Sequence, residues 1–512
     1  MQVPSFVDLN VGAALPGIIL ALGACLLLVV DLFLPRSRRD VTPWLAMLLI
    51  GIAFVVNLFT FNSAEQFALE EMFIADPFTG FMNIIVLVGA ALSILLSIDY
   101  MKRINAARGE FYVLMLFSAA GAMFMSSAND MVVVFVALEL LSIPLYVMAA
   151  FRRDNIKSEE SGMKYFILGA FASAFLVYGA ALMYGATGTT NLPEIFSQVS
   201  GIVASAGPER FYLAIGAALV LVGLGFKVGV VPFHMWTPDV YEGAPTPATA
   251  FMSVTAKIGG FGALLRVLLI GLPAEVFTSQ ADVATWQNTL WIIAAVTLIL
   301  GNFVAVSQRN IKRMLAYSSI AHAGYILMAV AAAGTPGVAT EATRGALFYL
   351  LGYTFANIGA FAIAMTIERA DGSGTNIDDF RGLGKRNPWM AMMMAIFLFS
   401  FAGVPLTAGF ISKWLIFQPT LQAGLVVLAV IGVLTSVVSA YYYVRITIFM
   451  FFMDSADEAA DAEHDRTSLG ATSTYLNWAI YASLAGTIIL GVLPILATSL
   501  VETVNVALLL PQ

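Results

Sequence analysis

Apolar stretches long enough to cross a membrane as helices recur from one end of this chain to the other. Each holds about 17–25 residues, the number that spans the roughly 30 Å of hydrocarbon in a bilayer. Of the 512 residues, 60% are hydrophobic and only 11% are charged, whereas a soluble globular domain is about 25% charged. We therefore expect an all-α polytopic membrane protein with fourteen spans, at residues 11–34, 43–62, 77–98, 111–127, 131–151, 161–184, 210–231, 246–270, 288–306, 314–333, 345–368, 389–417, 422–450 and 473–500.

Lysine and arginine residues gather in the loops on one side of the predicted spans. The opposite loops contain only Arg210 and Arg344, beside acidic runs such as Glu70-Glu71. Because basic loops stay in the cytoplasm, the orientation follows, and an even number of spans places both termini outside. The start of the chain lacks the basic region of a signal peptide, so we expect the first apolar stretch to be retained. The basic side carries Arg36, Arg38, Arg39, Lys102, Arg103, Arg108, Arg152, Arg153, Lys157, Arg309, Lys312, Arg313, Arg369, Arg381, Lys385, Arg386 and Arg466.

Two predicted spans, the seventh and the twelfth, are interrupted by proline in a matching way. One reads GLGFKVGVVPFHMWTP around Pro232, and the other reads SFAGVPLTAGFISKW around Pro405. Proline removes a backbone donor and clashes with the preceding turn, so both helices should be broken at membrane depth. Paired breaks five spans apart indicate an inverted repeat of spans 4–8 and 9–13. The predicted organisation is helices 1–3 in residues 1–110, the repeats in 111–270 and 288–450, and helix 14 in 473–512.

Ionisable side chains lie at membrane depth in several of these spans. A charged group at the centre of a membrane helix costs roughly 2.5–3.5 kcal/mol on insertion scales, so a structural role rarely accounts for several of them. Four lysines with one glutamate also lack the opposite charge needed for complete pairing. We interpret them as groups that exchange protons: Glu139, Lys164, Lys227, His234, Lys257 and Lys413.

Four of these candidates lie near the middle of their spans or beside a break. Lys257 is too central for its side chain to reach the membrane surface easily. Lys227 precedes the first break and Lys413 follows the second. Burial brings the charged and neutral forms of a lysine closer in energy, as proton transfer requires. Glu139 lies five residues before Pro144, where it can pair with a lysine and control its proton, or be satisfied by a neighbouring helix.

Three further candidates have a second explanation. Lys164 lies nearer the cytoplasmic end of its span, where its side chain could instead snorkel to the surface. His234, just past the first break, could carry protons between lysines or cap the broken helix. His322, mid-span in YSSIAHAGY, fits either a proton relay or an interhelical hydrogen bond.

The remaining features favour structural roles. Arg266, Arg445 and Asp31 fall near span ends, where snorkelling is sufficient, and Asp76 precedes a proline as a helix N-cap. Cys25 is the single cysteine and lies in an apolar run, which excludes a disulfide framework and a thiolate metal site. The net charge of −7 argues against nucleic acid as a partner, and no motif for a phosphate, haem or iron–sulfur site is present. His464, in the acidic loop DSADEAADAEHDR, is expected to be solvated.

Three stretches of the chain are distinctive: VALELLSIPLYVMAAFRR, GFKVGVVPFHMWTPDVYEGAPTPATAFMSVTAK and MLAYSSIAHAGY. They closely resemble the N-type antiporter-like membrane subunits of proton-pumping NADH–quinone oxidoreductase, respiratory complex I. The stretch FAGVPLTAGFISKW extends the resemblance over nearly the full length, and TPDVYEGAPTP is highly specific. LELLSIPLY and the lysine at position 413 favour the N type over the related M type.

The resemblance implies a polar axis of proton-transfer groups along the membrane midplane. The family's glutamate in the fifth span corresponds to Glu139, and the histidine after the first break corresponds to His234. The lysines of its sixth, seventh, eighth and twelfth spans correspond to Lys164, Lys227, Lys257 and Lys413.

The resemblance also implies where this subunit works and with what. No cofactor is bound by the chain, and NADH, FMN, iron–sulfur clusters and quinone belong to other subunits. The implied partners are the M-type antiporter-like subunit and the small K-type subunit, in a prokaryotic plasma (inner) membrane.

The expected function is proton translocation through the buried Glu/Lys/His axis, driven by electron transfer from NADH to quinone in other subunits. Two other classes of function stay open. One is an Mrp-type cation/proton antiporter subunit without a redox partner, and the other is a structural spacer whose charges are no longer used.

Overall fold

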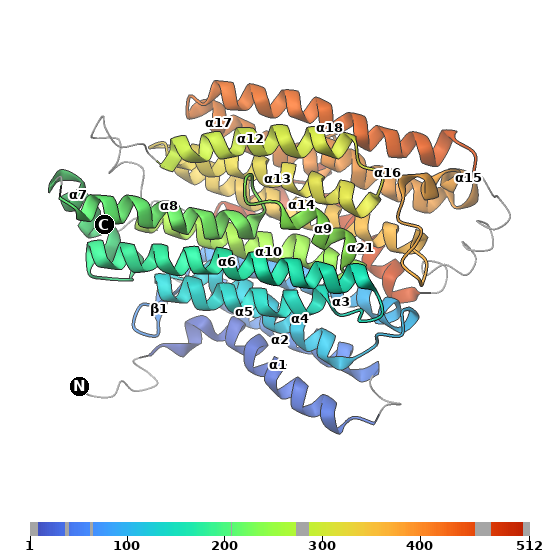
Figure 1. The fold of residues 1–512 in the computed structure, drawn as a ribbon, viewed down its shortest axis with the longest axis horizontal. Helices are drawn as coiled ribbons and strands as arrows, with labels where there is room; N and C mark the ends of the chain where they lie inside the picture. Colours follow the sequence, from blue (N-terminus) through green and yellow to red (C-terminus); the bar gives the residue numbers. More distant parts are fainter. Residues whose placement is uncertain are drawn as a thin grey trace.

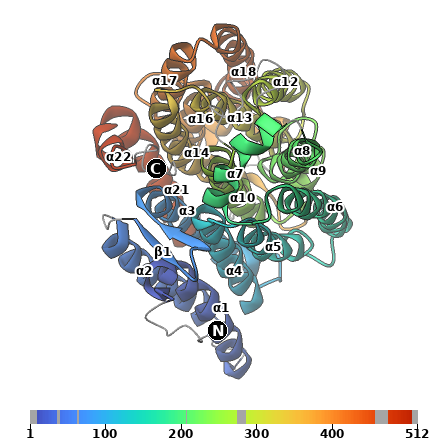
Figure 2. The same ribbon diagram turned by 90° about the vertical axis from the view of Figure 1, so that its left-hand side faces the viewer.

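The computed structural model describes residues 9–35, 40–61, 65–205, 207–272, 286–455 and 473–504. Long helices lie side by side and form one bundle, seen from the side in Figure 1 and along the helices in Figure 2. In the described part of the chain, 13 helices are long and apolar enough to span a membrane. They are η1 with α1 (Val11–Phe33), α2 (Thr42–Phe61), α3 (Pro77–Arg103), α4 (Gly109–Ser127), α5 (Met131–Ala149), α6 (Ile156–Thr187), α8 (Glu209–Val228), α10 with η3 (Thr246–Gly271), α12 (Trp286–Val306), α13 (Ile311–Ala333), α14 (Ala339–Ile367), α18 (Val426–Phe452) and α21 (Thr474–Val492).

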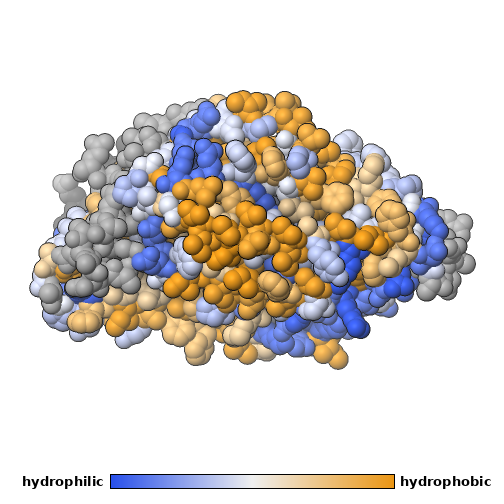
Figure 3. Space-filling view, turned by 90° about the horizontal axis from the view of Figure 1, so that it is seen from above, coloured by the Kyte–Doolittle hydropathy of each residue, from blue (hydrophilic) through white to orange (hydrophobic). Residues whose placement is uncertain are grey.

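The twelfth predicted span, residues 389–417, is a pair of shorter helices, α16 (Pro388–Ala402) and α17 (Ala408–Gln422). The all-α polytopic fold is thereby confirmed. The surface fits a bilayer, because the face in Figure 3 is apolar across its middle and more hydrophilic towards its ends. The acidic loop with His464 and Arg466 lies outside the described residues.

Small elements cover the two ends of the bundle. One end carries α7 (Leu192–Ser205) and an antiparallel hairpin of β1 (Gln66–Ala68) and β2 (Phe73–Ala75), and the opposite end carries α15 (Leu383–Arg386) (Figure 1). The described chain starts at the hairpin, where the amide of Leu69 donates to the carbonyl of Leu9. It finishes after α22 (Ile495–Val501), which packs on α3 and α14. The basic loops lie at the end of α15, which we call the basic end, and the hairpin end is called the acidic end.

Both predicted breaks are present, and glycine rather than proline ends the first half of each helix. After α8 the chain passes through Gly229, with φ of 76°, before α9 (Trp236–Gly243). After α16 it passes through Gly403, with φ of 88°. This left-handed conformation suits glycine, and it terminates a helix by closing hydrogen bonds back onto the last turn. Pro232 and Pro405 lie beyond these glycines and keep the helices from resuming at once.

The two halves pack in the same order and run in opposite directions. Within the first half, α4 packs on α5, α5 on α6, and α6 on both pieces of the broken helix α8/α9, while α10 packs on α4 and α8. The second half repeats these contacts with α12, α13, α14, α16/α17 and α18. Since α4 starts at the basic end and α12 starts at the acidic end, the second half is inverted. The arrangement brings the two breaks to the middle of one bundle.

The expectation of snorkelling was wrong for Asp31, which is 4% exposed and accepts from the Thr42 hydroxyl, and for Arg266. The Arg266 side chain is 1% exposed and forms a two-pronged ion pair with Asp76, at 2.8 Å and 2.6 Å between nitrogen and oxygen. Its remaining donors reach the carbonyl of Ser126 and the hydroxyl of Thr79. Asp76 is also the predicted N-cap of α3, accepting from the amide of Thr79. The carboxylate comes from a different span, so the sequence near Arg266 carried no sign of it.

Replacing Arg266 with methionine should lower the free energy of unfolding by about 3–5 kcal/mol, because the buried Asp76 carboxylate loses its counter-charge. The double variant Asp76→Asn/Arg266→Met should recover part of the loss, since asparagine retains the N-cap. Thermal unfolding of the purified variants in detergent measures the change in the free energy of unfolding for the single and the double variant. Lys102→Met, at a partly exposed ion pair with Asp40, is the control and should change the free energy by about 0–1 kcal/mol. An Arg266→Met variant as stable as the control would contradict this account.

Candidate functional site

Four of the predicted side chains lie in the interior of the bundle, near the two breaks. Lys227 on α8, Lys257 on α10, His322 on α13 and Lys413 on α17 are each at most 7% exposed. These helices come from both inverted halves. Hydroxyl and backbone carbonyl groups bind these four side chains, and further hydroxyl groups lie beside them.

Lys257 binds the carbonyl group freed by the first break. Its ammonium nitrogen donates to the carbonyl of Val228, the last residue of α8, at 3.0 Å. It also donates to the carbonyl of Ser319 on α13, at 2.9 Å. The last carbonyls of a helix lack intrahelical partners and carry a partial negative charge, which attracts a cation. Lys257 thus connects the break in the first half to a helix of the second half.

Lys413 makes the equivalent contact at the second break. Its nitrogen donates to the carbonyl of Ala402, the last residue of α16, at 2.8 Å, and to the hydroxyl of Ser436 on α18, at 2.6 Å. The nitrogen also lies 4.9 Å from the centre of the Tyr325 ring. A Cβ atom at Gly403 would lie 2.9 Å from the Lys413 side chain, so this glycine also makes room for the lysine.

Lys227 is surrounded by hydroxyl groups and aromatic rings. Its nitrogen lies 2.6 Å from the Ser142 hydroxyl on α5 and 3.4 Å from the Tyr165 hydroxyl on α6. It lies 5.8 Å and 5.3 Å from the ring centres of Tyr146 and Tyr165. Polarisable rings and neutral hydroxyls stabilise an ammonium group without fixing its charge as a carboxylate would.

Glu139 lies close to Lys227 but does not form an ion pair with it. The carboxylate is half-buried on α5 and accepts a hydrogen bond from the Ser173 hydroxyl on α6. Ser142, the partner of Lys227, lies one turn further along α5. The carboxylate and the ammonium group therefore contact serines on neighbouring turns of the α5/α6 pair. The α5 helix itself continues through Pro144.

The His322 ring lies near side chains that neighbour Lys257 and Lys413. Its centre is 5.1 Å from that of the Tyr353 ring, whose hydroxyl donates to Ser319, and 6.1 Å from that of the Tyr325 ring beside Lys413. Its Nδ1 is 2.6 Å from the Tyr349 hydroxyl on α14, and its Nε2 is 3.3 Å from the Tyr443 hydroxyl on α18. The interhelical hydrogen bonds raised as one alternative are therefore present, and the proton relay stays a prediction.

The two other predicted residues lie away from this chain. Lys164 is at the basic end of α6, where its side chain is 41% exposed and pairs with Glu160 and Asp239 at 2.7 Å each. This position agrees with the snorkelling alternative. His234 is half-buried in the segment between α8 and α9, and within the described structure its ring makes no hydrogen bond to the lysines.

The sequence prediction missed the hydroxyl groups that connect the charged residues. Tyr353 on α14 donates to the Ser319 hydroxyl at 2.8 Å, and Tyr443 joins the hydroxyls of Ser318, at 2.6 Å, and Tyr442, at 3.4 Å. Tyrosines in the middle of apolar spans were the available signal.

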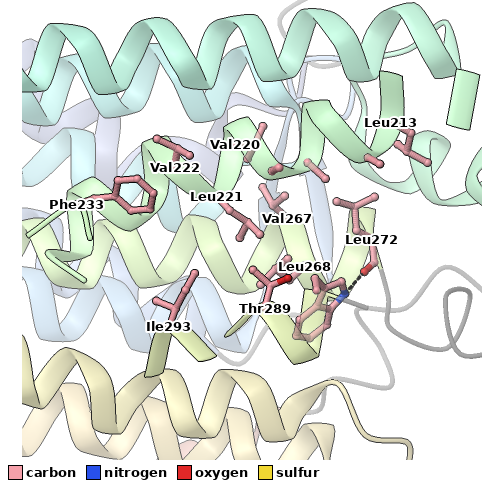
Figure 4. A pocket seen from close by; sticks show the side chains of 14 residues that line it. Leu213, Val220, Leu221, Val222, Phe233, Val267, Leu268, Leu272, Thr289 and Ile293 are labelled. Atoms are coloured by element: carbon pink, nitrogen blue, oxygen red, sulfur yellow. Dashed lines mark hydrogen bonds between the residues drawn. The ribbon is translucent and has the colours of Figure 1, made fainter. Parts of the chain in front are cut away.

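A large apolar cavity lies outside this chain. It encloses about 310 Å³ between α8, η3 (Val267–Gly271) and α12 (Figure 4). Its lining is apolar except for Thr289 and the indole of Trp286, which donates to the carbonyl of Leu272. No titratable side chain lines it, so it cannot be where protons are exchanged.

The geometry suits the movement of protons rather than covalent chemistry. Lysine and histidine can gain and lose protons, and hydroxyl groups can accept one proton while donating another. Each buried lysine is held by carbonyl or hydroxyl oxygens, and none is paired with a carboxylate among the described residues. A neutral amine therefore leaves no unpaired negative charge behind.

Known proteins with the same fold and sequence pattern give the family. Residues 128–439 match the family described as "NADH:quinone oxidoreductase/Mrp antiporter, TM". NADH-quinone oxidoreductase subunit N of Trichlorobacter lovleyi is 44% identical over 490 residues, which cover 96% of each chain.

Solved structures agree on the fold. A chain of respiratory complex I from Thermus thermophilus superposes with a TM-score of 0.74 at 31% identity, covering 96% of this chain and 100% of its own. A chain of the Mrp complex from Dietzia has a TM-score of 0.81 at 20% identity, covering 96% of this chain and 97% of its own, and it shows the fold alone. The chain therefore belongs to the family of antiporter-like membrane subunits that NADH–quinone oxidoreductases share with Mrp antiporters.

Proposed function

We propose that this chain is the N-type membrane subunit of an NADH–quinone oxidoreductase and moves protons along its buried lysine and histidine chain. The observation that carries the proposal is the pair of lysines bound to the carbonyls of the two helix breaks, with His322 packed against the tyrosines near both. Each lysine can release its proton towards a neighbour when the adjoining half-helix moves. Electron transfer in other subunits supplies the energy.

In the proposed order of transfer, a proton moves from Lys227 to Lys257, and then through His322 to Lys413. Glu139 holds Lys227 in its charged form, and a rearrangement that separates them drives a proton towards Lys257. His322 then passes it towards Lys413, whose contact with Ser436 lies in the second half. Lys164 and His234 serve, in this proposal, at the edge of the path rather than within it.

The partners and surroundings follow from the same proposal. NADH, FMN, iron–sulfur clusters and quinone are bound by other subunits, and the neighbouring chains are an M-type antiporter-like subunit and a small K-type subunit. The relatives named as subunit N support this assignment. The membrane is the inner membrane of a prokaryote, with both termini on its external side.

An Mrp-type antiporter subunit is the second candidate function. The Dietzia Mrp chain has the higher TM-score, but its identity of 20% is well below the 44% of the relative named subunit N. Genes for redox subunits beside this gene would support the first proposal, and genes for Mrp subunits would support the second.

Lys257→Met should abolish proton transfer at this position, because methionine carries no exchangeable proton. We expect proton pumping and quinone reductase activity of the assembled complex to fall about 10²-fold or more if Lys257 is an obligatory transfer group. Lys257→Arg should not restore them, since a guanidinium group does not release its proton at accessible pH. Lys102→Met, at the basic surface, is the control. Normal pumping by an assembled Lys257→Met complex would refute the assignment.

Glu139→Gln and Lys227→Met should impair the same step, so the double variant should be little worse than either single variant. Glu139→Asp should retain part of the activity because it keeps the charge. Pumping per NADH at equal assembly measures the coupling. Ser173→Ala tests the hydrogen bond of Glu139 alone and should cost less than loss of the charge. Losses that add fully in the double variant would show two independent sites.

The proposed orientation predicts opposite labelling at the two ends of the bundle. In a Cys25→Ala background, Gln198→Cys on α7 should react with a membrane-impermeant thiol reagent in intact cells. Ser307→Cys, between α12 and α13, should react only after the cytoplasmic side is opened. The reverse pattern would invert the topology.

A further inference from the structure

A buried carboxylate at the basic end is used by none of the steps proposed above. Glu368 directly follows α14 and is 4% exposed. Its two oxygens accept hydrogen bonds from neutral hydroxyl groups, Tyr100 of α3 at 2.9 Å and Thr246 of α10 at 2.6 Å. Because a hydroxyl group can donate or accept, both partners stay hydrogen-bonded whether Glu368 is charged or protonated.

From Thr246 a stripe of polar side chains runs along α10 to Lys257. Thr246, Thr249, Ser253 and Lys257 are spaced three, four and four residues apart, which places them on one face of the helix. All four are buried. The rise from the first to the last is about 17 Å at 1.5 Å per residue, so the stripe links the basic end to the centre of the bundle.

Side chains of α14 keep this face of α10 polar. Asn357 donates to the Ser253 hydroxyl at 2.5 Å. Tyr353, one turn earlier on α14, donates to the hydroxyl of Ser319, whose carbonyl binds Lys257. Neighbouring groups on one helix face are about 5–6 Å apart, a gap that one bridging water spans.

Positive groups surround Glu368 without forming an ion pair with its carboxylate in the described structure. Arg103 donates to its backbone carbonyl. Lys312, on α13, donates to the carbonyl of Ala244 at 2.7 Å and interacts with Glu368 electrostatically. Glu368 thus lies beside cations while its carboxylate is hydrogen-bonded by neutral hydroxyl groups.

We propose that Glu368 takes up protons at the basic end of the subunit and passes them along the Thr246–Thr249–Ser253 stripe to Lys257. The inference rests on the function proposed above and names the residue that supplies Lys257. A proton from the solvent binds the Glu368 carboxylate, and each hydroxyl group then accepts one proton and donates another. The amine of Lys257 becomes ammonium and the Glu368 carboxylate is restored. No electrons are transferred.

The test compares Glu368→Gln with Glu368→Asp in the assembled complex. Glutamine keeps the volume and a hydrogen-bond acceptor but cannot carry a proton, so we expect NADH-driven proton pumping to fall about tenfold or more, within the range of acid–base groups. Aspartate keeps the acid and should retain most of the activity. If Glu368 only positions α10, glutamine should serve at least as well as aspartate, and this result would overturn the proposal.

A second pair of variants tests the stripe itself. Ser253→Ala removes a hydroxyl group from the stripe and should slow pumping. Thr255→Ala is the matched control, because Thr255 is equally buried on the opposite face of the same helix. Equal activity of the two variants would contradict a path along the stripe.

Lys257→Met, measured in parallel, separates the two proposals. If it leaves pumping intact, the proposed function fails. If it blocks pumping while Glu368→Gln does not, only the uptake route through Glu368 is wrong.

Discussion

The contact between a lysine ammonium and the carbonyl at the end of a broken helix organises the centre of this protein. Lys257 binds the last carbonyl of α8, and Lys413 binds the last carbonyl of α16. A carbonyl without a partner is costly at membrane depth, and so is a lysine. The carbonyl and the lysine satisfy each other by a hydrogen bond. The ammonium charge is then stabilised by the dipole at the end of the helix instead of by a carboxylate. In the function proposed above, this bond positions the lysine and leaves its proton available for transfer.

The inverted repeat explains why two such contacts lie in one chain of polar groups. The halves meet where α10 and α13 approach α14, and Lys257 reaches across to the carbonyl of Ser319 in the second half. His322 and its tyrosine partners then continue the chain towards Lys413. In the proposed function, a movement of either half-helix would shift a carbonyl relative to a lysine and so couple conformation to protonation.

The ends of the bundle contain paired charges, whereas the lysines at its centre have no carboxylate partner among the described residues. At the acidic end the buried pair Arg266–Asp76 ties α10 to α3 and caps the latter helix. At the basic end Lys164, Asp239 and Arg313 form a partly exposed network that joins α6, α9 and α13. Compensated charges of this kind stabilise the ends. The centre contains lysines without carboxylate partners, and the buried Glu368 lies on the route between the two regions.

The sequence by itself determined the membrane class, the number of spans, the two breaks and the central lysines, because hydrophobic length and intramembrane charge are local properties of the chain. It did not reveal that Arg266 is buried, that Lys164 lies off the central chain, or that tyrosines and serines join the lysines. Those facts depend on which side chains face each other across helices far apart in sequence, such as Tyr443 and His322, or Glu368 and Thr246. Only the packing of the helices decides such pairs.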